Sequence, residues 1–286
     1  MKKILILGSE GQIGSHLKYY LTNKKYDVLE FDIINSRYQD LRISNNQKLE
    51  QYIKKCDFIF FLAFDVGGSK YLKKYQKTYH FLMNNVSIMK NTFEQIKKNK
   101  KEFIFVTSQM SNMSHSPYGV LKKIGEQITE SLNGISVRLW NVYGIEKDLE
   151  KSHVVTDFIL KGLKNKSIKM ITNGEEKRDF LYAEDCCAGF ETIMKKFHNL
   201  NSHKVIDLNY GKYIKILKIA NIIKDIFSKN NLDVTIVKGK ELDQVQKNLI
   251  NASDKILRKY WRPKYNINKG IEEVFRYYKY AYKKNL

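Results

Sequence analysis

The sequence has few of the features that mark secreted, membrane-spanning or disordered proteins. Its 286 residues include 2 prolines, 3 cysteines and no low-complexity tract. Scarce proline argues against long disordered linkers. The cysteines follow no metal-ligand spacing and make no plausible disulfide framework, so we expect no metal site. The longest apolar run, 58–64, is far shorter than the ~20 residues of a membrane helix. We therefore expect a cytoplasmic protein that does not enter a membrane.

The sequence has many more basic than acidic residues. Lys and Arg number 51 and Asp and Glu 30, which gives a formal net charge of +21. A basic surface attracts nucleic acid, but the lysines are scattered in pairs, and no basic block or nucleic-acid motif gathers them. We expect no nucleic-acid partner and keep RNA binding as the weakest alternative. An anionic small substrate fits the charge equally well.

A glycine-spaced turn follows the first apolar segment. Residues 4–7 predict a short buried strand, and Gly8, Gly11 and Gly14 follow before an apolar pattern of helical period. Gly8 allows the tight turn, Gly11 lets the backbone approach a pyrophosphate, and Gly14 permits close packing of strand and helix. Asp32 ends the second strand, where its carboxylate can bind an adenosine ribose and repel a 2′-phosphate. The pattern predicts NAD rather than NADP, with a glycine turn in another α/β protein as the alternative.

The stretch 103–122 carries the candidate catalytic groups. An apolar strand over 103–106 ends at Thr107 and Ser108, and Tyr118 and Lys122 follow on one face of a predicted helix. A cation favours the phenolate, so we expect Lys122 to lower the pKa of Tyr118 while Ser108 hydrogen-bonds the same substrate oxygen. In a chain with 19 tyrosines this spacing also arises by chance, and a helix that only supports the core is the alternative.

Taken in order, these motifs resemble the extended short-chain dehydrogenase/reductases, and more narrowly the NAD-dependent epimerase/dehydratase group that acts on nucleotide sugars. Further segments share the resemblance: Asp40-Leu41, Phe61–Phe64, Asn84–Val86, Arg138–Gly144, Arg178–Tyr182 and Trp261–Pro263. Besides the glycines, Asp32, Tyr118 and Lys122, it implies cofactor contacts from Gln12, Ile13, Asp40, Leu41, Leu62, Ala63, Phe64, Asn85, Thr107 and Leu139. It implies substrate contacts from Val66, Gly67, Gly68, Ser108, Gln109, Met110, Asn141 and Arg178.

The pattern of elements predicts an α/β fold, a Rossmann-type doubly wound parallel sheet with a smaller C-terminal α/β substrate lobe. The expected strands lie near 3–7, 28–32, 58–62, 103–107 and 135–139, and the helices near 12–22, 45–55, 76–98 and 117–131. We expect an NAD-binding domain over 1–144 with returning segments in 179–209, and a substrate lobe over 145–178 and 210–286. The resemblance implies a homodimer packed through the helices that contain Asn85 and Tyr118.

Departures from the family pattern narrow the chemistry. Gln109 and Met110 stand where the family's dehydratases carry an Asp-Glu pair, and neither exchanges a proton near neutral pH. GDP-fucose synthases place a cysteine at the position of Met110 and a histidine where this chain has Glu146. We therefore expect neither dehydration nor epimerisation at C3 or C5. Hydride transfer at a carbinol carbon remains, with Tyr118 taking the hydroxyl proton.

Three functions follow from this reading. The first is an NAD-dependent oxidoreductase that interconverts a hydroxyl and a ketone, at C4, of a nucleotide sugar in surface polysaccharide biosynthesis. The turn at 66–68 resembles GDP-fucose synthases and GDP-mannose 3,5-epimerases, which favours a GDP-linked hexose or heptose. The second is a nucleotide-sugar 4-epimerase with tightly bound NAD, which uses the same residues. The third is a dinucleotide-binding protein without catalysis.

Overall fold

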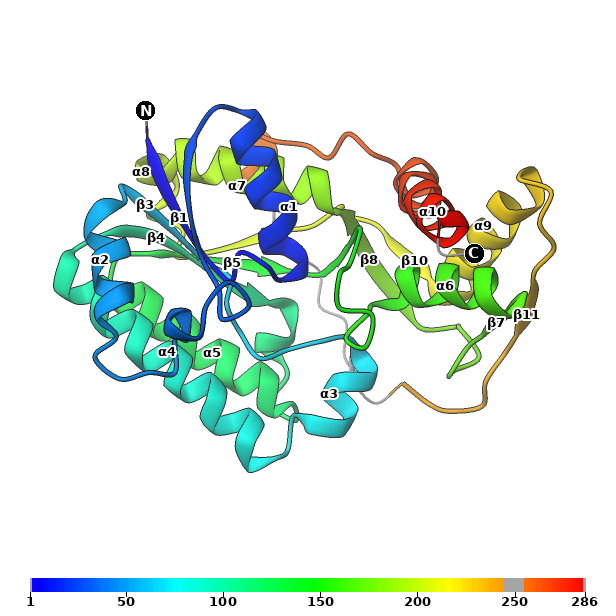
Figure 1. The fold of residues 1–286 in the computed structure, drawn as a ribbon, viewed down its shortest axis with the longest axis horizontal. Helices are drawn as coiled ribbons and strands as arrows, with labels where there is room; N and C mark the ends of the chain where they lie inside the picture. The colour runs from blue at the N-terminus through cyan, green and yellow to red at the C-terminus, as the bar shows by residue number, and fades with distance from the viewer. Residues whose placement is uncertain (1, 244–254, 285–286) are drawn as a thin grey trace.

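The structure, a computed structural model, describes residues 2–243 and 255–284. They form a larger lobe around a six-stranded sheet and a smaller lobe around two short sheets (Figure 1). No helix within the described residues is long and apolar enough to cross a membrane.

The larger lobe is built on an all-parallel sheet with the order β2-β1-β3-β4-β5-β9. Strands β2 and β3 lie on opposite sides of β1, so the strand order switches from one side of the sheet to the other between β1 and β3. Folds of this kind bind ligands at that switch point, beyond the carboxyl ends of the strands. The five strands expected from the sequence are confirmed. The bounds are β1 (Lys3–Leu7), β2 (Asp27–Phe31), β3 (Phe58–Phe61), β4 (Glu102–Ser108), β5 (Ile135–Leu139) and β9 (Val205–Leu208).

Helices cover both faces of this sheet, which is why its strands are apolar on both sides. Alternate residues of β1 point to opposite faces: Ile4 and Ile6 join one core cluster, and Leu5 and Leu7 join another. The first cluster is closed by α1 (Gln12–Asn23) and α7 (Ala183–Lys195). The second is closed by α2 (Gln47–Lys55), α4 (Tyr79–Asn99) and α5 (Pro117–Ser131). The expected doubly wound architecture is therefore present.

The helix expected near 76–98 is present as α4, and a further helix that the sequence did not predict precedes it. The structure has α3 (Ser69–Tyr75), a turn, and then α4. Thr78 separates them because its Oγ1 accepts a hydrogen bond from the Phe81 N–H, 3.3 Å away, and so caps α4. As a result α3 is set apart from the sheet and lies between the two lobes (Figure 1).

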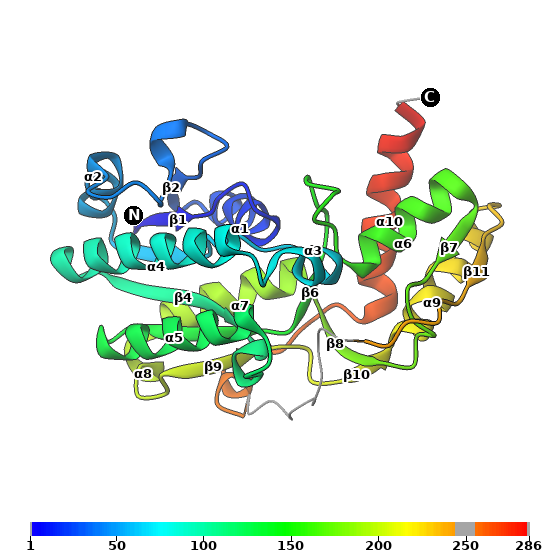
Figure 2. The same cartoon turned by 90° about the horizontal axis from the view of Figure 1, so that it is seen from below.

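The smaller lobe contains a three-stranded sheet, β10-β8-β6, and a parallel pair, β11-β7. Its strands are β6 (Asn141–Tyr143), β7 (Ser167–Lys169), β8 (Lys177–Tyr182), β10 (Tyr213–Lys215) and β11 (Thr235–Val237). Its helices, seen together in Figure 2, are α6 (Val154–Asn165), α9 (Ile216–Lys229) and α10 (Ile267–Lys284). A short α8 (Phe197–Leu200) and 3₁₀ turns at Arg37–Gln39, Gln109–Asn112 and Leu257–Lys259 complete the described elements.

The chain passes from the smaller lobe back to the larger one. Within 179–209, α7 and β9 pack in the larger lobe, whereas β8 pairs with β6 and β10 in the three-stranded sheet. The division into an NAD-binding domain and a substrate lobe stays a prediction.

Candidate active site

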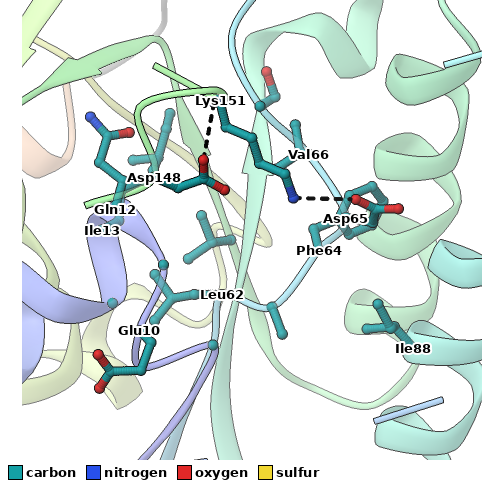
Figure 3. Close-up of a pocket in the computed structure, with 18 of the residues that line it drawn as sticks. Glu10, Gln12, Ile13, Leu62, Phe64, Asp65, Val66, Ile88, Asp148 and Lys151 are labelled. Atoms are coloured by element: carbon teal, nitrogen blue, oxygen red, sulfur yellow. Dashed lines mark hydrogen bonds and ion pairs between the residues drawn. The ribbon is translucent and has the colours of Figure 1, made fainter. Parts of the chain in front are cut away.

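A cavity of about 800 Å³, here called the first cavity, lies at the carboxyl ends of the central strands (Figure 3). Most of the site residues expected from the sequence line it, although they come from positions as distant as 8 and 141. They are Gly8, Gly11, Gln12, Ile13, Gly14, Asp32, Asp40, Leu41, Leu62, Ala63, Phe64, Val66, Gly67, Gly68, Thr107, Ser108, Met110, Tyr118, Lys122, Leu139 and Asn141.

The three glycines of the turn have different surroundings. Gly8 has a φ of +89°, and a Cβ there would lie 2.8 Å from the Ala63 backbone. A Cβ on Gly14 would overlap the Gly8 carbonyl oxygen. The nearest atom to a Cβ on Gly11 is that same oxygen, at an ordinary 3.5 Å. Protein packing therefore requires Gly8 and Gly14, whereas the bare backbone at Gly11 leaves space that a pyrophosphate can use.

Asp32 is fixed at the rim of this cavity. Its Oδ2 accepts a hydrogen bond from the Glu10 N–H (2.9 Å) and its Oδ1 from the Ile34 N–H (3.0 Å). Each carboxylate oxygen keeps acceptor capacity for a ribose hydroxyl. Together with the open backbone at Gly11, these groups fit a dinucleotide with a free 2′-hydroxyl.

The candidate catalytic groups meet in the wall of the first cavity. Ser108 ends β4, and its side chain lies near enough to the hydroxyl of Tyr118 from α5 to influence the pKa of the phenol. Lys122, one turn further along α5, is only 3% exposed. Its Nζ donates to the Val106 carbonyl oxygen (2.7 Å) and lies 3.7 Å from the centroid of the Phe64 ring. The structure thus brings the three predicted groups together in a dry environment.

The predicted lowering of the Tyr118 pKa is wrong for this structure. Burial raises the pKa of Tyr118 to about 12, although the neighbouring Ser108 side chain opposes the rise. Burial also lowers the pKa of Lys122 to about 7, with Glu126 opposing. The sequence argument assumed a full positive charge beside the phenol. Desolvation instead penalises both charged forms, and the amine is held by Val106 and Phe64.

Two expected site residues line neither the first cavity nor the second cavity described below. Asn85 is fully buried; its Oδ1 accepts from the Asp65 N–H (2.7 Å), and its Nδ2 donates to the carbonyl oxygens of Asp65 and Phe81. It therefore holds the loop after β3 to α4. Gln109 is buried in the 3₁₀ turn after β4 and lines neither this cavity nor the one described next.

A second cavity of about 560 Å³ lies between α3 and the smaller lobe. Arg178 of β8, expected at the substrate, lines this cavity and not the first. Its guanidinium forms an ion pair with Asp243 and donates to the Lys177 carbonyl oxygen (2.8 Å). Four residues line both cavities and mark where they adjoin: Ser69, Asn141, Val142 and His153.

The sequence reading missed an acid–base pair at this junction. Glu146, 6% exposed, accepts hydrogen bonds from the backbone N–H of His153 and lies 2.6 Å from its Nδ1. Burial favours the neutral acid, but the hydrogen bonds from His153 hold the pKa of Glu146 below its ordinary value. Glu146 does stand where GDP-fucose synthases carry a histidine, and the structure brings the imidazole of His153 next to it. His153 lies seven residues after Glu146, and no sequence motif at that spacing predicts that the two side chains meet.

Charged side chains also cross the mouth of the first cavity. Lys151 reaches the Asp65 carboxylate across the cavity, with Nζ 3.7 Å from Oδ1 (Figure 3). Asp65 additionally accepts a hydrogen bond from the Tyr71 hydroxyl (2.6 Å). These contacts tie the loop after β6 to the segment after β3. Nowhere in residues 2–243 and 255–284 do three or more His, Cys, Asp or Glu residues gather in a metal-binding group.

Comparison with known proteins agrees with this geometry. The family model described as the NAD dependent epimerase/dehydratase family matches residues 4–209. The chain is 25% identical over 291 residues to CDP-abequose synthase of Salmonella muenchen, covering 96% of this chain and 97% of that protein.

Solved structures share the fold. Epimerase Mth375 of Methanothermobacter thermautotrophicus superposes with a TM-score of 0.82 at 18% identity, covering 99% of this chain and 93% of that one. A GDP-6-OMe-4-keto-L-xylo-heptose reductase from C. jejuni gives a TM-score of 0.80 at 20% identity, with 98% of both chains covered. The protein described here therefore belongs to the NAD-dependent epimerase/dehydratase family, whose members are enzymes acting on nucleotide sugars.

Proposed function

We propose that the protein is an NAD-dependent oxidoreductase that interconverts a hydroxyl and a ketone, at C4, of a nucleotide-activated sugar. The observation that carries the proposal is the burial of Ser108, Tyr118 and Lys122 together in the wall of a cavity that begins at the glycine turn. Bound NAD supplies the hydride acceptor or donor, and the backbone at Gly11 and the Asp32 carboxylate would hold it.

In this proposal Tyr118 moves the proton. With a pKa of about 12, its phenol stays protonated at neutral pH and can donate to the alkoxide that forms when a ketone is reduced. Ser108 lies near the Tyr118 hydroxyl and is placed to contact the same substrate oxygen. Lys122, with a pKa of about 7, exchanges protons near neutral pH beside them.

The nucleotide occupies the second cavity in this proposal. The planar guanidinium of Arg178 can bind phosphate oxygens bidentately, and Asn141 at the junction faces both cavities. The turn at 66–68 borders the first cavity and supports a GDP-linked hexose or heptose. The family resemblance supports a role in surface polysaccharide biosynthesis in the cytoplasm.

A homodimer packed through α4 and α5 belongs to the same proposal. Neighbouring parts of these two helices expose apolar side chains, namely Met83, Val86, Val120 and Ile124. A second copy of the chain would bury them.

The test begins with denaturing extraction of the purified protein and identification of any released dinucleotide. The protein is then incubated with GDP-, CDP-, UDP- and dTDP-sugars and NAD, and with 4-keto sugars and NADH, while absorbance at 340 nm and product mass are followed. CDP-sugars are included because of the CDP-abequose synthase relative. A mass change of about two daltons coupled to NADH supports the oxidoreductase.

Other outcomes replace the proposal. An isomeric product without net NADH would identify a 4-epimerase instead. Bound NAD without turnover of any sugar would favour a dinucleotide-binding protein that does not catalyse.

A further inference from the structure

The helix α3, which the sequence reading did not anticipate, points lysines at the second cavity. Lys70 and Lys73 are one turn apart on α3 and line this cavity together with Arg178. The Nζ of Lys70 lies 2.8 Å from Oδ1 of Asp157 in α6. The Nζ of Lys73 lies 2.7 Å from Oε2 of Glu241, beyond β11. Two lysines that are neighbours on the surface of α3 thus contact two separate segments of the smaller lobe.

These two ion pairs have little value as structural braces. The lysine side chains are 52% and 54% exposed and Glu241 is 55% exposed, whereas Asp157 is 19% exposed and keeps a second ion pair, with Lys161. Ion pairs exposed to this degree are screened by water and contribute little to stability. A lysine ammonium on a flexible stem changes partners readily. The position of the pairs at the edge of a cavity that also contains Arg178 therefore calls for another explanation.

We propose that Lys70 and Lys73 bind the diphosphate of the nucleotide sugar, exchanging Asp157 and Glu241 for phosphate oxygens when substrate enters the second cavity. The inference rests on the proposed function and adds α3 to the substrate site. The two linked phosphates carry one negative charge for each carboxylate that they replace, so both ammonium groups keep an anionic partner after the exchange. The spacing of one helical turn places the two ammonium groups side by side, as two linked phosphates require.

The test compares substitutions that should change the Kd for nucleotide in opposite directions. Calorimetric titration with GDP, CDP, UDP and dTDP in turn gives Kd values for the unmodified protein and its variants. Lys73→Gln removes a charged donor and should raise Kd about tenfold, and the double variant with Lys70→Gln should raise it further. Glu241→Gln removes the competing carboxylate and should lower Kd severalfold. If the pair were only a brace between the lobes, both substitutions would weaken binding.

Matched controls are available in the chain. Lys77→Gln removes an exposed lysine just beyond α3 that lines neither cavity. Glu175→Gln breaks an exposed ion pair of the same 2.7 Å length, with Lys215, and neither of these two residues lines a cavity. Neither should change Kd, and Lys73→Arg should retain binding. The double lysine variant should also show a weaker dependence of Kd on salt.

The failures are distinguishable. If the unmodified protein binds none of the four nucleotides, both the proposed function and this inference fail. If it binds one of them and the double lysine variant binds equally well, or Glu241→Gln weakens binding, only this inference is overturned.

Discussion

The two cavities of this protein differ in how they are assembled. The first is lined by residues that follow strands of one parallel sheet, at the edge where every strand ends. The second gathers residues between 69 and 243 from α3, α6, both small sheets and the segment beyond β11. A cavity at the strand ends is specified by short local motifs. A cavity between lobes depends on how distant segments pack.

The electrostatics of the two cavities differ in the same way. In the first, burial shifts the pKa of Tyr118 and of Lys122 toward their neutral forms. In the second, side chains of opposite charge meet in ion pairs, such as Lys73 with Glu241. This difference supports our proposal that proton transfer takes place in the first cavity and that the second cavity recognises an anion.

Replacing Tyr118 with Phe is the strongest way to test this division. The change removes the hydroxyl that moves the proton and retains the ring that packs on Phe64. We expect turnover to fall by ~10²–10⁴, while binding of NAD and of nucleotide stays within about twofold. Steady-state rates at 340 nm and calorimetric titration measure the two effects. A comparable loss of nucleotide affinity would show that proton transfer and nucleotide binding are not separated between the two cavities.

Arg178→Gln tests the second cavity, and here we expect a loss of nucleotide binding. Loss of the guanidinium should weaken nucleotide binding by about 1.5–3 kcal/mol, because hydrogen bonds between charged groups are the strong ones. NAD affinity should be unchanged, since Arg178 does not line the first cavity. Asp243 is left without this ion pair in the variant, so a melting temperature measured alongside separates lost affinity from lost folding. Weakened NAD binding would contradict the assignment.

Two alanine substitutions in the glycine turn sharpen what the first cavity requires. Gly14→Ala should destabilise the protein by about 1–3 kcal/mol, because its Cβ overlaps the Gly8 carbonyl oxygen. Gly11→Ala should leave stability nearly unchanged and weaken NAD binding, because its Cβ meets only ordinary contacts and occupies space meant for the ligand. Urea unfolding and NAD titration read out the pair. Equal loss of stability in both variants would contradict the conclusion that packing requires Gly14 but not Gly11.

The buried amine predicts a pH dependence of stability. The folded pKa of Lys122 is about 7 and its unfolded pKa about 10.4, so the unfolded chain holds the extra proton between these values. The free energy of unfolding should therefore rise with pH from 7 to 10 in the unmodified protein relative to Lys122→Met, by about 1 kcal/mol per pH unit. Urea titrations of both proteins at each pH give the difference. A constant difference would mean that Lys122 is not desolvated.

Much of the fold and of the first cavity could be predicted from the sequence. Strands with apolar residues on both faces, such as β3, and the three-residue spacing of the glycines reflect rules that act over a few residues. Asn85 was placed correctly on its helix but assigned to the cofactor. Whether a buried amide faces a cavity or the Asp65 backbone depends on a loop twenty residues away.

The sequence by itself determined the doubly wound sheet, the glycine turn and the meeting of Ser108, Tyr118 and Lys122, because strand ends and helix faces follow from local periodicity. Only the tertiary structure decided the protonation tendencies of Tyr118 and Lys122, since desolvation depends on everything packed around them. It also decided the pairing of Glu146 with His153 and the approach of Lys73 to Glu241. Such contacts form when distant segments fold against each other, and no local pattern encodes which ones will meet.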